Sequence, residues 1–283
     1  MPDQKKTKIV ATLGPAIADR KIMKQMILEG VDVFRVNFSH ANYDNVKSSI
    51  AMIRELGKEL GISTAVLGDL QGPKLRVGIM KEEVVVEPGD VISFCTGEEF
   101  RGNREKVYMN YDNFPLDVKK GERILLDDGK LMFEVLETNG KDEVKATVIQ
   151  GGPLLSKKGV NLPNTNISLP ALTVKDKEDA IFAISQEVDW LALSFVRNAE
   201  DLKGLRALIE EHSDYKIPII AKIEKPDAVR NIDKLIPYCD GLMVARGDLG
   251  VEVPAEEVPL IQRLLVHTAK RARIPVLIAT QMM

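Results

Sequence analysis

The sequence predicts an α/β fold: a parallel (β/α)8 TIM-type barrel that stops after its seventh strand, with a small all-β barrel domain inserted after strand three. Three observations support this prediction. Short apolar runs alternate with helical patterns in residues 1–70 and 167–283, residues 71–166 are rich in β-type runs, and six of the seven apolar runs end in polar side chains. Continuous apolar runs are typical of parallel strands buried on both faces.

Residues 1–70 open the barrel with an alternation of strands and helices. In the first helical pattern apolar side chains recur on one face, and Gly30 provides a stop signal. This order is that of a βαβα unit, which predicts parallel strands covered by helices. The apolar runs lie at 7–14, 31–39 and 64–67, and helical patterns follow the first two at 19–30 and 43–61.

Residues 71–166 are predicted to form an inserted β lid domain. Their β-rich runs are broken by Pro-Gly-Asp and Asp-Asp-Gly turns. The alternation then resumes, so residues 1–70 and 167–283 form one discontinuous barrel domain that is incomplete at its carboxyl end. In this second part the apolar runs lie at 188–196, 217–224, 240–248 and 274–282, and the helical patterns at 176–187, 199–212, 226–237 and 256–273.

The polar strand ends favour a barrel over an open, doubly wound sheet. An open dinucleotide-binding sheet would carry Gly-x-Gly-x-x-Gly after a strand, and the sequence contains none. In (β/α)8 barrels the active site is built on the carboxyl ends of the strands, so these polar residues would converge on one mouth. They are Arg35, Asn37, Ser39, Asp69, Ser194, Arg197, Lys222, Glu224, Arg246, Asp248, Thr280 and Gln281.

The alternation of side chains along a strand sharpens this expectation. It directs Arg35, Asn37 and Ser39 to one face, and it places Lys222 beside Glu224. Polar side chains inside a sheet are costly to bury unless something pairs with them. An anionic ligand with a cation beside it would pair with these polar side chains.

Composition excludes several classes of partner. The chain is 45% hydrophobic and 29% charged, and its net charge of −3 provides no cationic field for nucleic acid or an anionic membrane surface. No apolar run approaches the roughly 18–20 residues of a membrane helix. The start lacks a secretion signal, and Cys95 and Cys239 have no metal-like spacing. We therefore expect a cytoplasmic protein with a small-molecule partner.

The charged strand ends indicate a reaction class. Glu224 and Asp248 follow successive strands, and two carboxylates with room for substrate oxygens suit Mg²⁺. Arg35, Arg76 and Lys222 add positive charge near the same place. Phosphoryl transfer depends mainly on positioning and charge neutralisation, so it is the reaction that these groups favour. A P-loop nucleotide site is excluded, because no Gly-x-x-x-x-Gly-Lys-Ser/Thr occurs.

Five segments of the chain carry a resemblance to a known family. They are "VDVFRVNFSH", "SKKGVNLPN", "IIAKIEKPDAV", "GLMVARGDLGVEV" and "ATQMM". They resemble the characteristic segments of pyruvate kinases, in that family's order along essentially the whole chain. The resemblance implies a (β/α)8 barrel with a β lid after strand three. It also implies transfer of the phosphoryl group of phosphoenolpyruvate to ADP, which yields pyruvate and ATP, with Mg²⁺ or Mn²⁺ as cofactor and a homotetramer for the full-length protein.

The resemblance implies a role for each matching position at the substrate. Arg35 would bind the phosphoryl group, and Lys222 would neutralise it during transfer. Glu224 and Asp248 would hold Mg²⁺ between the carboxylate and phosphate of the substrate. The backbone N–H groups of Gly247 and Asp248 would receive the substrate carboxylate, since helix N-termini favour anions.

Further positions are implied at the enolate and at the nucleotide. Thr280 would lie on the proton path to the methyl carbon of the product. Arg76 and Lys158 would contact the nucleotide phosphates, and Asn37 belongs to the same group of nucleotide-binding positions. Closure of the lid would expel water and strengthen these charge interactions.

One departure from the common family pattern predicts independence from potassium. In the family Asn37, Ser39, Asp69 and Leu70 would surround a monovalent cation, normally K⁺. Lys74 stands where many pyruvate kinases have glutamate. A lysine ammonium is a compact positive charge on a flexible stem. We therefore expect Lys74 to replace the monovalent cation, as in the potassium-independent type of the family, so that K⁺ is not required.

Plainer interpretations stay open for several residues. Lys158 is one of two lysines in a turn, where solvation is common, and Thr280 alone is an ordinary strand-end hydroxyl. His40 and Cys239 have no partner at catalytic spacing, so packing explains them better. Asn37, Ser39 and Asp69 could form a hydrogen-bonded belt below the mouth.

Three alternatives remain for the chain as a whole. The sequence stops where the family continues through an eighth strand and a C-terminal domain, so we expect a fragment of a longer chain, and the first alternative is that this fragment is catalytically incomplete on its own. A second alternative is another Mg²⁺-dependent barrel enzyme acting on phosphoenolpyruvate or pyruvate, such as a mutase or an aldolase. The third is a non-catalytic protein of this fold.

Overall fold

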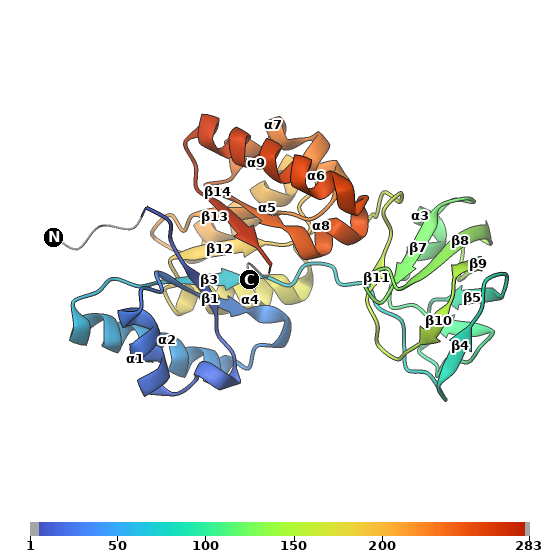
Figure 1. Ribbon diagram of the computed structural model, residues 1–283, viewed down its shortest axis with the longest axis horizontal. Helices are drawn as coiled ribbons and strands as arrows, with labels where there is room; N and C mark the ends of the chain where they lie inside the picture. The colour runs from blue at the N-terminus through green and yellow to red at the C-terminus, as the bar shows by residue number, and fades with distance from the viewer. Residues whose placement is uncertain (1–5, 281–283) are drawn as a thin grey trace.

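The computed structural model describes residues 6–280, and Figure 1 shows a parallel sheet with its helices beside a separate group of β-strands. The parallel sheet has seven strands in the order of the chain, which confirms the predicted α/β class. Within the described residues β1 and β15 lie at its two edges. The strands are β1 (Val10–Thr12), β2 (Val33–Asn37), β3 (Ala65–Asp69), β12 (Trp190–Leu193), β13 (Ile219–Ile223), β14 (Gly241–Ala245) and β15 (Val276–Ala279).

Helices connect the strands of this sheet, and none in residues 6–280 combines the length and apolarity needed to cross a bilayer. α4 begins earlier than the sequence pattern indicates, because Thr173 and Asp176 form a capping box. The longer helices are α1 (Arg20–Leu28), α2 (Tyr43–Leu60), α4 (Val174–Ser185), α5 (Ala199–His212), α8 (Arg246–Glu252) and α9 (Val258–Ala272).

The single helix expected at 226–237 is instead broken into three short pieces. Pro237 lies in the last piece, and it has no N–H with which to continue a helix. The pieces are α6 (Pro226–Arg230), α7 (Ile232–Leu235) and the 3-10 turn η3 (Ile236–Tyr238). The other 3-10 turns are η1 (Pro15–Ile17), η2 (Phe38–His40) and η4 (Ala255–Glu257).

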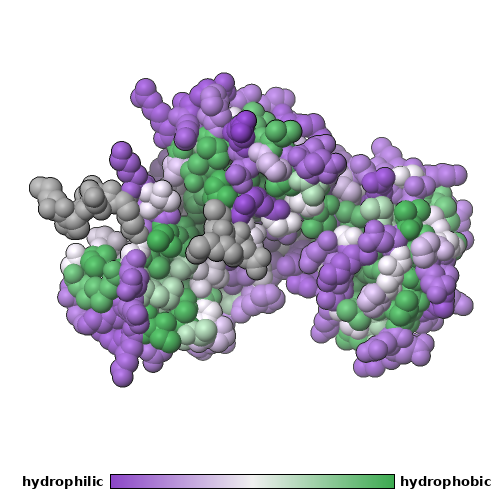
Figure 2. Space-filling view, in the orientation of Figure 1, coloured by the Kyte–Doolittle hydropathy of each residue, from purple (hydrophilic) through white to green (hydrophobic). Residues whose placement is uncertain are grey.

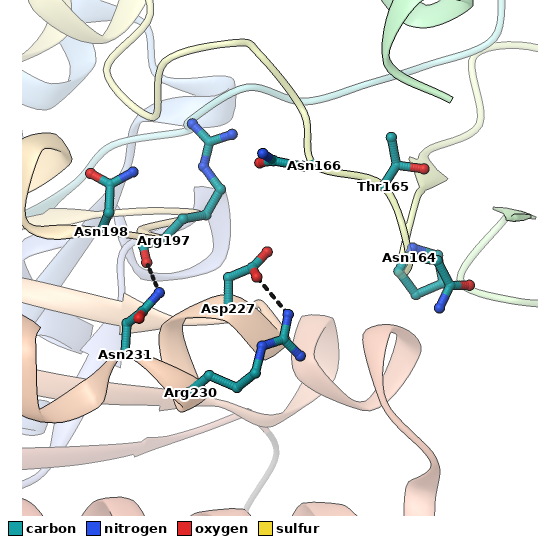
Figure 3. Close-up of a pocket in the computed structure, with 9 residues that line it drawn as sticks. Asn164, Thr165, Asn166, Arg197, Asn198, Asp227, Arg230 and Asn231 are labelled. Carbon is teal, nitrogen blue, oxygen red and sulfur yellow. Dashed lines mark hydrogen bonds and ion pairs between the residues drawn. The ribbon is translucent and has the colours of Figure 1, made fainter. Parts of the chain in front are cut away.

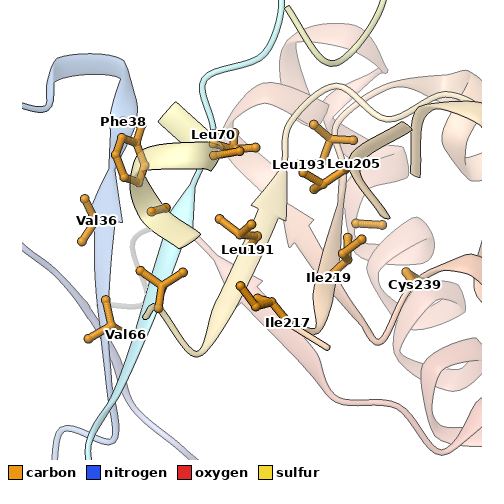
Figure 4. Close-up of a cluster of buried hydrophobic side chains, with 14 of the residues drawn as sticks. Val36, Phe38, Val66, Leu70, Leu191, Leu193, Leu205, Ile217, Ile219 and Cys239 are labelled. Atoms are coloured by element: carbon orange, nitrogen blue, oxygen red, sulfur yellow. The ribbon is translucent and has the colours of Figure 1, made fainter. Parts of the chain in front are cut away.

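Apolar side chains occupy both faces of the parallel sheet. The larger cluster packs between the sheet and the helices, and Figure 4 shows part of it around Leu191, Leu193 and Ile219. A smaller cluster on the other face contains Leu67, Ala192, Ile220 and Met243, all nearly inaccessible. Neighbouring positions of one strand therefore belong to different clusters, as the alternation of side chains requires.

The β-rich segment, residues 71–166, has its own sheets and its own core. Six strands form one sheet in the order β11-β7-β8-β9-β5-β6, and β4 pairs with β10. Its apolar cluster, which includes Phe94, Phe114 and Phe133, is separate from the clusters of the parallel sheet. The elements are β4 (Val84–Val86), β5 (Val91–Cys95), β6 (Lys106–Tyr108), α3 (Phe114–Asp117), β7 (Arg123–Leu126), β8 (Leu131–Thr138), β9 (Glu143–Gln150), β10 (Gly152–Leu154) and β11 (Val160–Asn161).

The chain enters and leaves the β segment along two paired stretches. Arg76 forms an antiparallel bridge with Gly159, and the N–H of Val160 donates to the carbonyl of Leu75 at 2.9 Å. Closer to the parallel sheet, Asp176 accepts a hydrogen bond from the N–H of Gly72 on the way out and from that of Thr173 on the way back. Asp176 therefore anchors both ends of the connection.

Two expectations about strand β2 and its neighbours are wrong. β2 ends at Asn37, and Ser39 lies in η2, where its N–H donates to Asn37 Oδ1 at 3.2 Å. The strand alternation therefore does not extend to Ser39. His40 is exposed, so packing in the core does not explain it, whereas Cys239 is buried as expected.

The two thiols should differ sharply in reactivity. Burial, reinforced by Asp240, raises the pKa of Cys239 to about 12, and burial also raises the pKa of the half-buried Cys95. Because the thiolate is the nucleophile, Ellman's reagent at pH 9 should label Cys95 in the native protein and Cys239 only after unfolding. The Cys95→Ser variant should then show no fast phase. Fast labelling of that variant would contradict the buried position of Cys239.

Candidate active site

Lys222 lies at the centre of a buried charge cluster at the carboxyl ends of β3 and β13. Its Nζ is 3.1 Å from Asp69 Oδ1 and 3.0 Å from Glu224 Oε1, and it donates to Ser194 Oγ at 2.6 Å. Burial opposes the charge of Lys222, but the carboxylates of Glu224 and Asp69 prevail and raise its pKa. Lys222 is therefore held as a cation, and the expected placement beside Glu224 is confirmed.

Glu224 is a buried carboxylate with the Lys222 ammonium and the Asp248 carboxylate both nearby. Its Oε2 accepts a hydrogen bond from the N–H of Phe195 at 2.7 Å. Burial raises the pKa of Glu224, Lys222 opposes that rise, and the nearby Asp248 adds to it. A divalent cation would relieve this repulsion between Glu224 and Asp248.

The two carboxylates fit a hard cation that takes its other ligands from a substrate. Within residues 6–280 no group of three or more His, Cys, Asp and Glu residues is arranged to hold a metal. Glu224 and Asp248 could thus offer two carboxylates to a metal, rather than a closed cage. Mg²⁺ is commonly bound in this way, through one or two carboxylates plus substrate oxygens and water.

Arg35 joins the same cluster from β2. Its Nε and Nη2 both lie 2.6 Å from Asp69 Oδ2, and its Nη1 donates to Thr12 Oγ1 at 3.0 Å. The Arg35 side chain is a quarter exposed, whereas Asp69 is 1% exposed. Asp69 therefore orients both Arg35 and Lys222 and leaves the guanidinium at the edge of the cluster, where a ligand can reach it.

The carboxyl ends of the strands open onto a cleft that the β segment borders. Lys74, Phe195 and Asp248 line it, together with Asn161 from β11. Figure 2 shows the surface hollowed between the two parts of the molecule, with hydrophilic residues around the hollow. Thr280 lies beside Gly247, the residue before Asp248, because its Oγ1 is 3.0 Å from the position that a Cβ on Gly247 would take.

The structure keeps two predicted residues apart from this cluster. Lys158 pairs with Asp127 at 2.9 Å, and Arg76 Nη1 donates to the carbonyl of Lys157 at 3.0 Å. Both contacts lie inside the β segment. Gln281, also predicted as a strand-end residue, lies outside the described residues.

Sequence reasoning missed the roles of Ser194, Lys225 and Glu252. Ser194 links Lys222 to the carbonyl of Leu70, to which its hydroxyl donates at 2.7 Å. Lys225 and Glu252 form a buried ion pair of 2.8 Å. A signal was present for Ser194, which is a hydroxyl at the end of an apolar run, but only the structure brings these residues to their partners.

A second pocket, of about 410 Å³, lies where the returning chain passes α5 and α6. Figure 3 shows that asparagine, arginine and aspartate side chains line it. Arg230 pairs with Asp227 at 2.5 Å, and Asn231 donates to the carbonyl of Arg197 at 3.3 Å. Among the positions proposed from the sequence only Arg197 reaches this pocket, so the cluster around Lys222 is the better candidate.

Known proteins match this chain over almost its full length. A family model described as the barrel domain of pyruvate kinase matches residues 4–283. Pyruvate kinase 2 of Synechocystis sp. is 44% identical, and the match covers 100% of this chain and 48% of that protein. The pyruvate kinases of Corynebacterium efficiens and Clostridium perfringens are 41% and 42% identical over 99% and 98% of this chain, and 59% of each is covered. The chain thus spans about half to three-fifths of the length of these relatives.

Proposed function

The chain belongs to the pyruvate kinase family, and on this premise we propose that the protein transfers the phosphoryl group of phosphoenolpyruvate to ADP, with pyruvate and ATP as products. One observation carries the proposal. Lys222 is a buried cation between Asp69 and Glu224, and Asp248 lies close to Glu224. A fixed positive charge beside two carboxylates that can hold a cation is suited to stabilising a transferring phosphoryl group.

Glu224 and Asp248 are the residues that would hold the divalent cation, Mg²⁺ or Mn²⁺. Their chemistry fits the cation, since both are carboxylates, and burial together with the nearby Asp248 raises the pKa of Glu224 despite the opposing charge of Lys222. The bound cation would offset the negative charge of the phosphoryl and carboxylate oxygens of the substrate. The structure supports the donor set, and metal titration would test it.

Arg35 and Lys222 bind and stabilise the phosphoryl group in this proposal. Asp69 holds both cations in place, and Ser194 fixes the Lys222 ammonium from the other side. The substrate carboxylate would lie at the N–H groups of Gly247 and Asp248, in the first turn of α8. Thr280, next to Gly247, would then stand beside the carbon that gains a proton.

The β segment acts as a lid in this proposal. Residues 1–70 and 167–283 would belong to the catalytic (β/α)8 barrel, and residues 71–166 would form the lid. The separate apolar clusters support this division. Closure of the lid would bring Arg76 and Lys158 to the nucleotide phosphates, with Asn37 at the same end of the site. For the full-length protein we propose a cytoplasmic homotetramer.

A coupled assay tests the proposed reaction. With phosphoenolpyruvate, ADP and Mg²⁺, lactate dehydrogenase and NADH should report pyruvate, and luciferase should report an equal amount of ATP. A mutase or an aldolase would yield no ATP, and a non-catalytic protein would yield neither product. A melting curve run alongside separates an unfolded protein from a folded protein without activity.

Lys74 replaces the monovalent cation in this proposal. It is exposed, lines the cleft with Phe195 and Asp248, and makes no hydrogen bond or ion pair through its ammonium group within residues 6–280. The oxygens that would bind K⁺ have other partners: Asp69 pairs with Arg35, and the carbonyl of Leu70 accepts from Ser194.

The Lys74→Glu variant should acquire a potassium requirement. Without the ammonium, we expect kcat in tetramethylammonium buffer to fall about tenfold or more and to recover on addition of K⁺. The unmodified protein should be equally active in both buffers, and Lys74→Met should lose activity without recovery. Strong activation of the unmodified protein by K⁺ would contradict the proposal.

A further inference from the structure

A buried ion pair lies at the mouth of the parallel sheet, outside the cluster around Lys222. Lys225 Nζ is 2.8 Å from Glu252 Oε1, with the two side chains 8% and 0% exposed. Lys225 follows Glu224 directly, and Glu252 is the last residue of α8, the helix that carries Asp248. Within the described residues the second oxygen, Glu252 Oε2, is buried and has no hydrogen-bond partner. A buried carboxylate of this kind depends strongly on each donor that it has.

This pair is joined to the β segment by direct contacts. Asn161 Nδ2 donates to Glu252 Oε1 at 2.8 Å, and Lys225 Nζ donates to the carbonyl of Leu162 at 3.4 Å. A turn of the β segment lies against the same helix, because a Cβ on Gly129 would be 3.8 Å from Val251 Cγ1. The carboxyl end of α8 is therefore one place where the β segment rests on the rest of the molecule.

The stretch that Asn161 belongs to also carries the proposed nucleotide contacts. Arg76 bridges Gly159, and the N–H of Val77 donates to the carbonyl of Lys158 at 3.0 Å. Arg76, Lys158 and Asn161 thus sit on one two-stranded ribbon. A hydrogen bond that fixes Asn161 to α8 fixes the distance of Arg76 and Lys158 from the helix of Asp248.

We propose that Asn161, through the Lys225–Glu252 pair, is a positioning residue that sets the β segment over the mouth and so governs binding of ADP. The inference rests on the proposed function. Asn161 touches neither substrate in this proposal. It acts through the ribbon, and the buried ion pair gives the ribbon a rigid support.

The Asn161→Ala variant removes the link and leaves the ion pair in place. In the intact protein we expect the KM for ADP to rise about tenfold, which corresponds to about 1.4 kcal/mol, with the KM for phosphoenolpyruvate nearly unchanged. Asn139→Ala is the matched control, because the side chain of Asn139 bonds only within its own turn of the β segment. Equal KM values for ADP in Asn161→Ala and the control would overturn the proposal.

Two further variants, which change the charges at the contact between Asn161 and Glu252, distinguish a positioning role of Asn161 from a general loss of stability. Asn161→Asp places a carboxylate against Glu252 and should raise the KM for ADP beyond that of Asn161→Ala. In the double variant with Glu252→Gln, the new amide can donate to the new carboxylate at position 161, so the contact again consists of one donor and one anion. This second substitution should reverse most of the rise in the KM for ADP. A double variant no better than Asn161→Asp would contradict the inference.

Hydrogen exchange tests the contact without turnover, so it distinguishes failure of this inference from failure of the proposed reaction. Asn161→Ala should speed amide exchange in residues 157–162 in the absence of substrate, whereas Asn139→Ala should not. Unchanged exchange there overturns the positioning role even if phosphoryl transfer is established. Faster exchange in a protein without kinase activity supports the contact and refutes the reaction.

Discussion

Replacing Lys222 by methionine is expected to lower kcat for phosphoryl transfer on the order of 10³-fold. The substitution keeps the length of the side chain and removes the ammonium that lies 3.0–3.1 Å from Glu224 and Asp69. Two buried carboxylates would then face each other with Arg35 as the remaining cation of the cluster. Because breaking a buried ion pair leaves an uncompensated charge, the free energy of unfolding should also fall by about 3–5 kcal/mol.

Urea denaturation and the coupled assay measure the two effects separately. Lys216→Met is the control, since Lys216 is 67% exposed and pairs with Asp240 at the surface, where an ion pair contributes about 0–1 kcal/mol. This control should stay close to the unmodified protein in both measurements. A Lys222→Met variant that folds and retains kcat within about tenfold would remove Lys222 from the proposed mechanism.

Gly72→Ala is expected to reduce the free energy of unfolding by about 2–5 kcal/mol and to lower activity. Gly72 has a φ of +72°, and a Cβ there would lie 2.8 Å from Phe195 Cδ2 and 3.0 Å from Ser194 Cβ. Relief of this overlap must displace Ser194, whose hydroxyl fixes Lys222, or break the hydrogen bond from Gly72 to Asp176. A change at the entrance of the β segment should therefore disturb the charge cluster around Lys222.

Gly61→Ala provides the matched control for backbone strain. Its φ is +64°, but nothing lies within 4 Å of the added Cβ. This variant should lose only the cost of the left-handed conformation, about 1 kcal/mol, with kcat unchanged. Equal losses of stability in the two variants, by chemical denaturation, would show that the overlap with Phe195 and Ser194 relaxes at no cost.

The sequence predicted the structure correctly where neighbouring residues alone decide the outcome, as in the alternation of side chains along a strand. The alternation along residues 31–39 sets Arg35 and Asn37 apart from Val36 and Phe38, and the last two are buried in the larger apolar cluster. The same rule placed Lys222 beside Glu224. It failed at Ser39, because the strand ends at Asn37, and at 226–237, because apolar periodicity does not record the breaks between α6, α7 and η3.

Strand alternation and apolar periodicity could not predict contacts between segments that are distant in the sequence. Glu252 meets Lys225 from another strand–helix unit and Asn161 from the β segment, so no single stretch of sequence contains the arrangement. Ser194 was visible as a polar strand end, but its link from Lys222 to Leu70 depends on the pairing of β3 with β12. Burial of these groups follows from the assembled fold rather than from residue type.

The place of the β segment also has a consequence for the order of folding. β3 and β12 are neighbours in the parallel sheet, although the whole β segment lies between them in the chain. Loop closure costs more entropy as the loop lengthens, and such non-local pairings slow folding. Once the β segment has formed its own core, the bridge between Arg76 and Gly159 holds its two ends together. Early collapse of the β segment would thus turn a long-range encounter of β3 and β12 into a short-range one and speed assembly of the sheet.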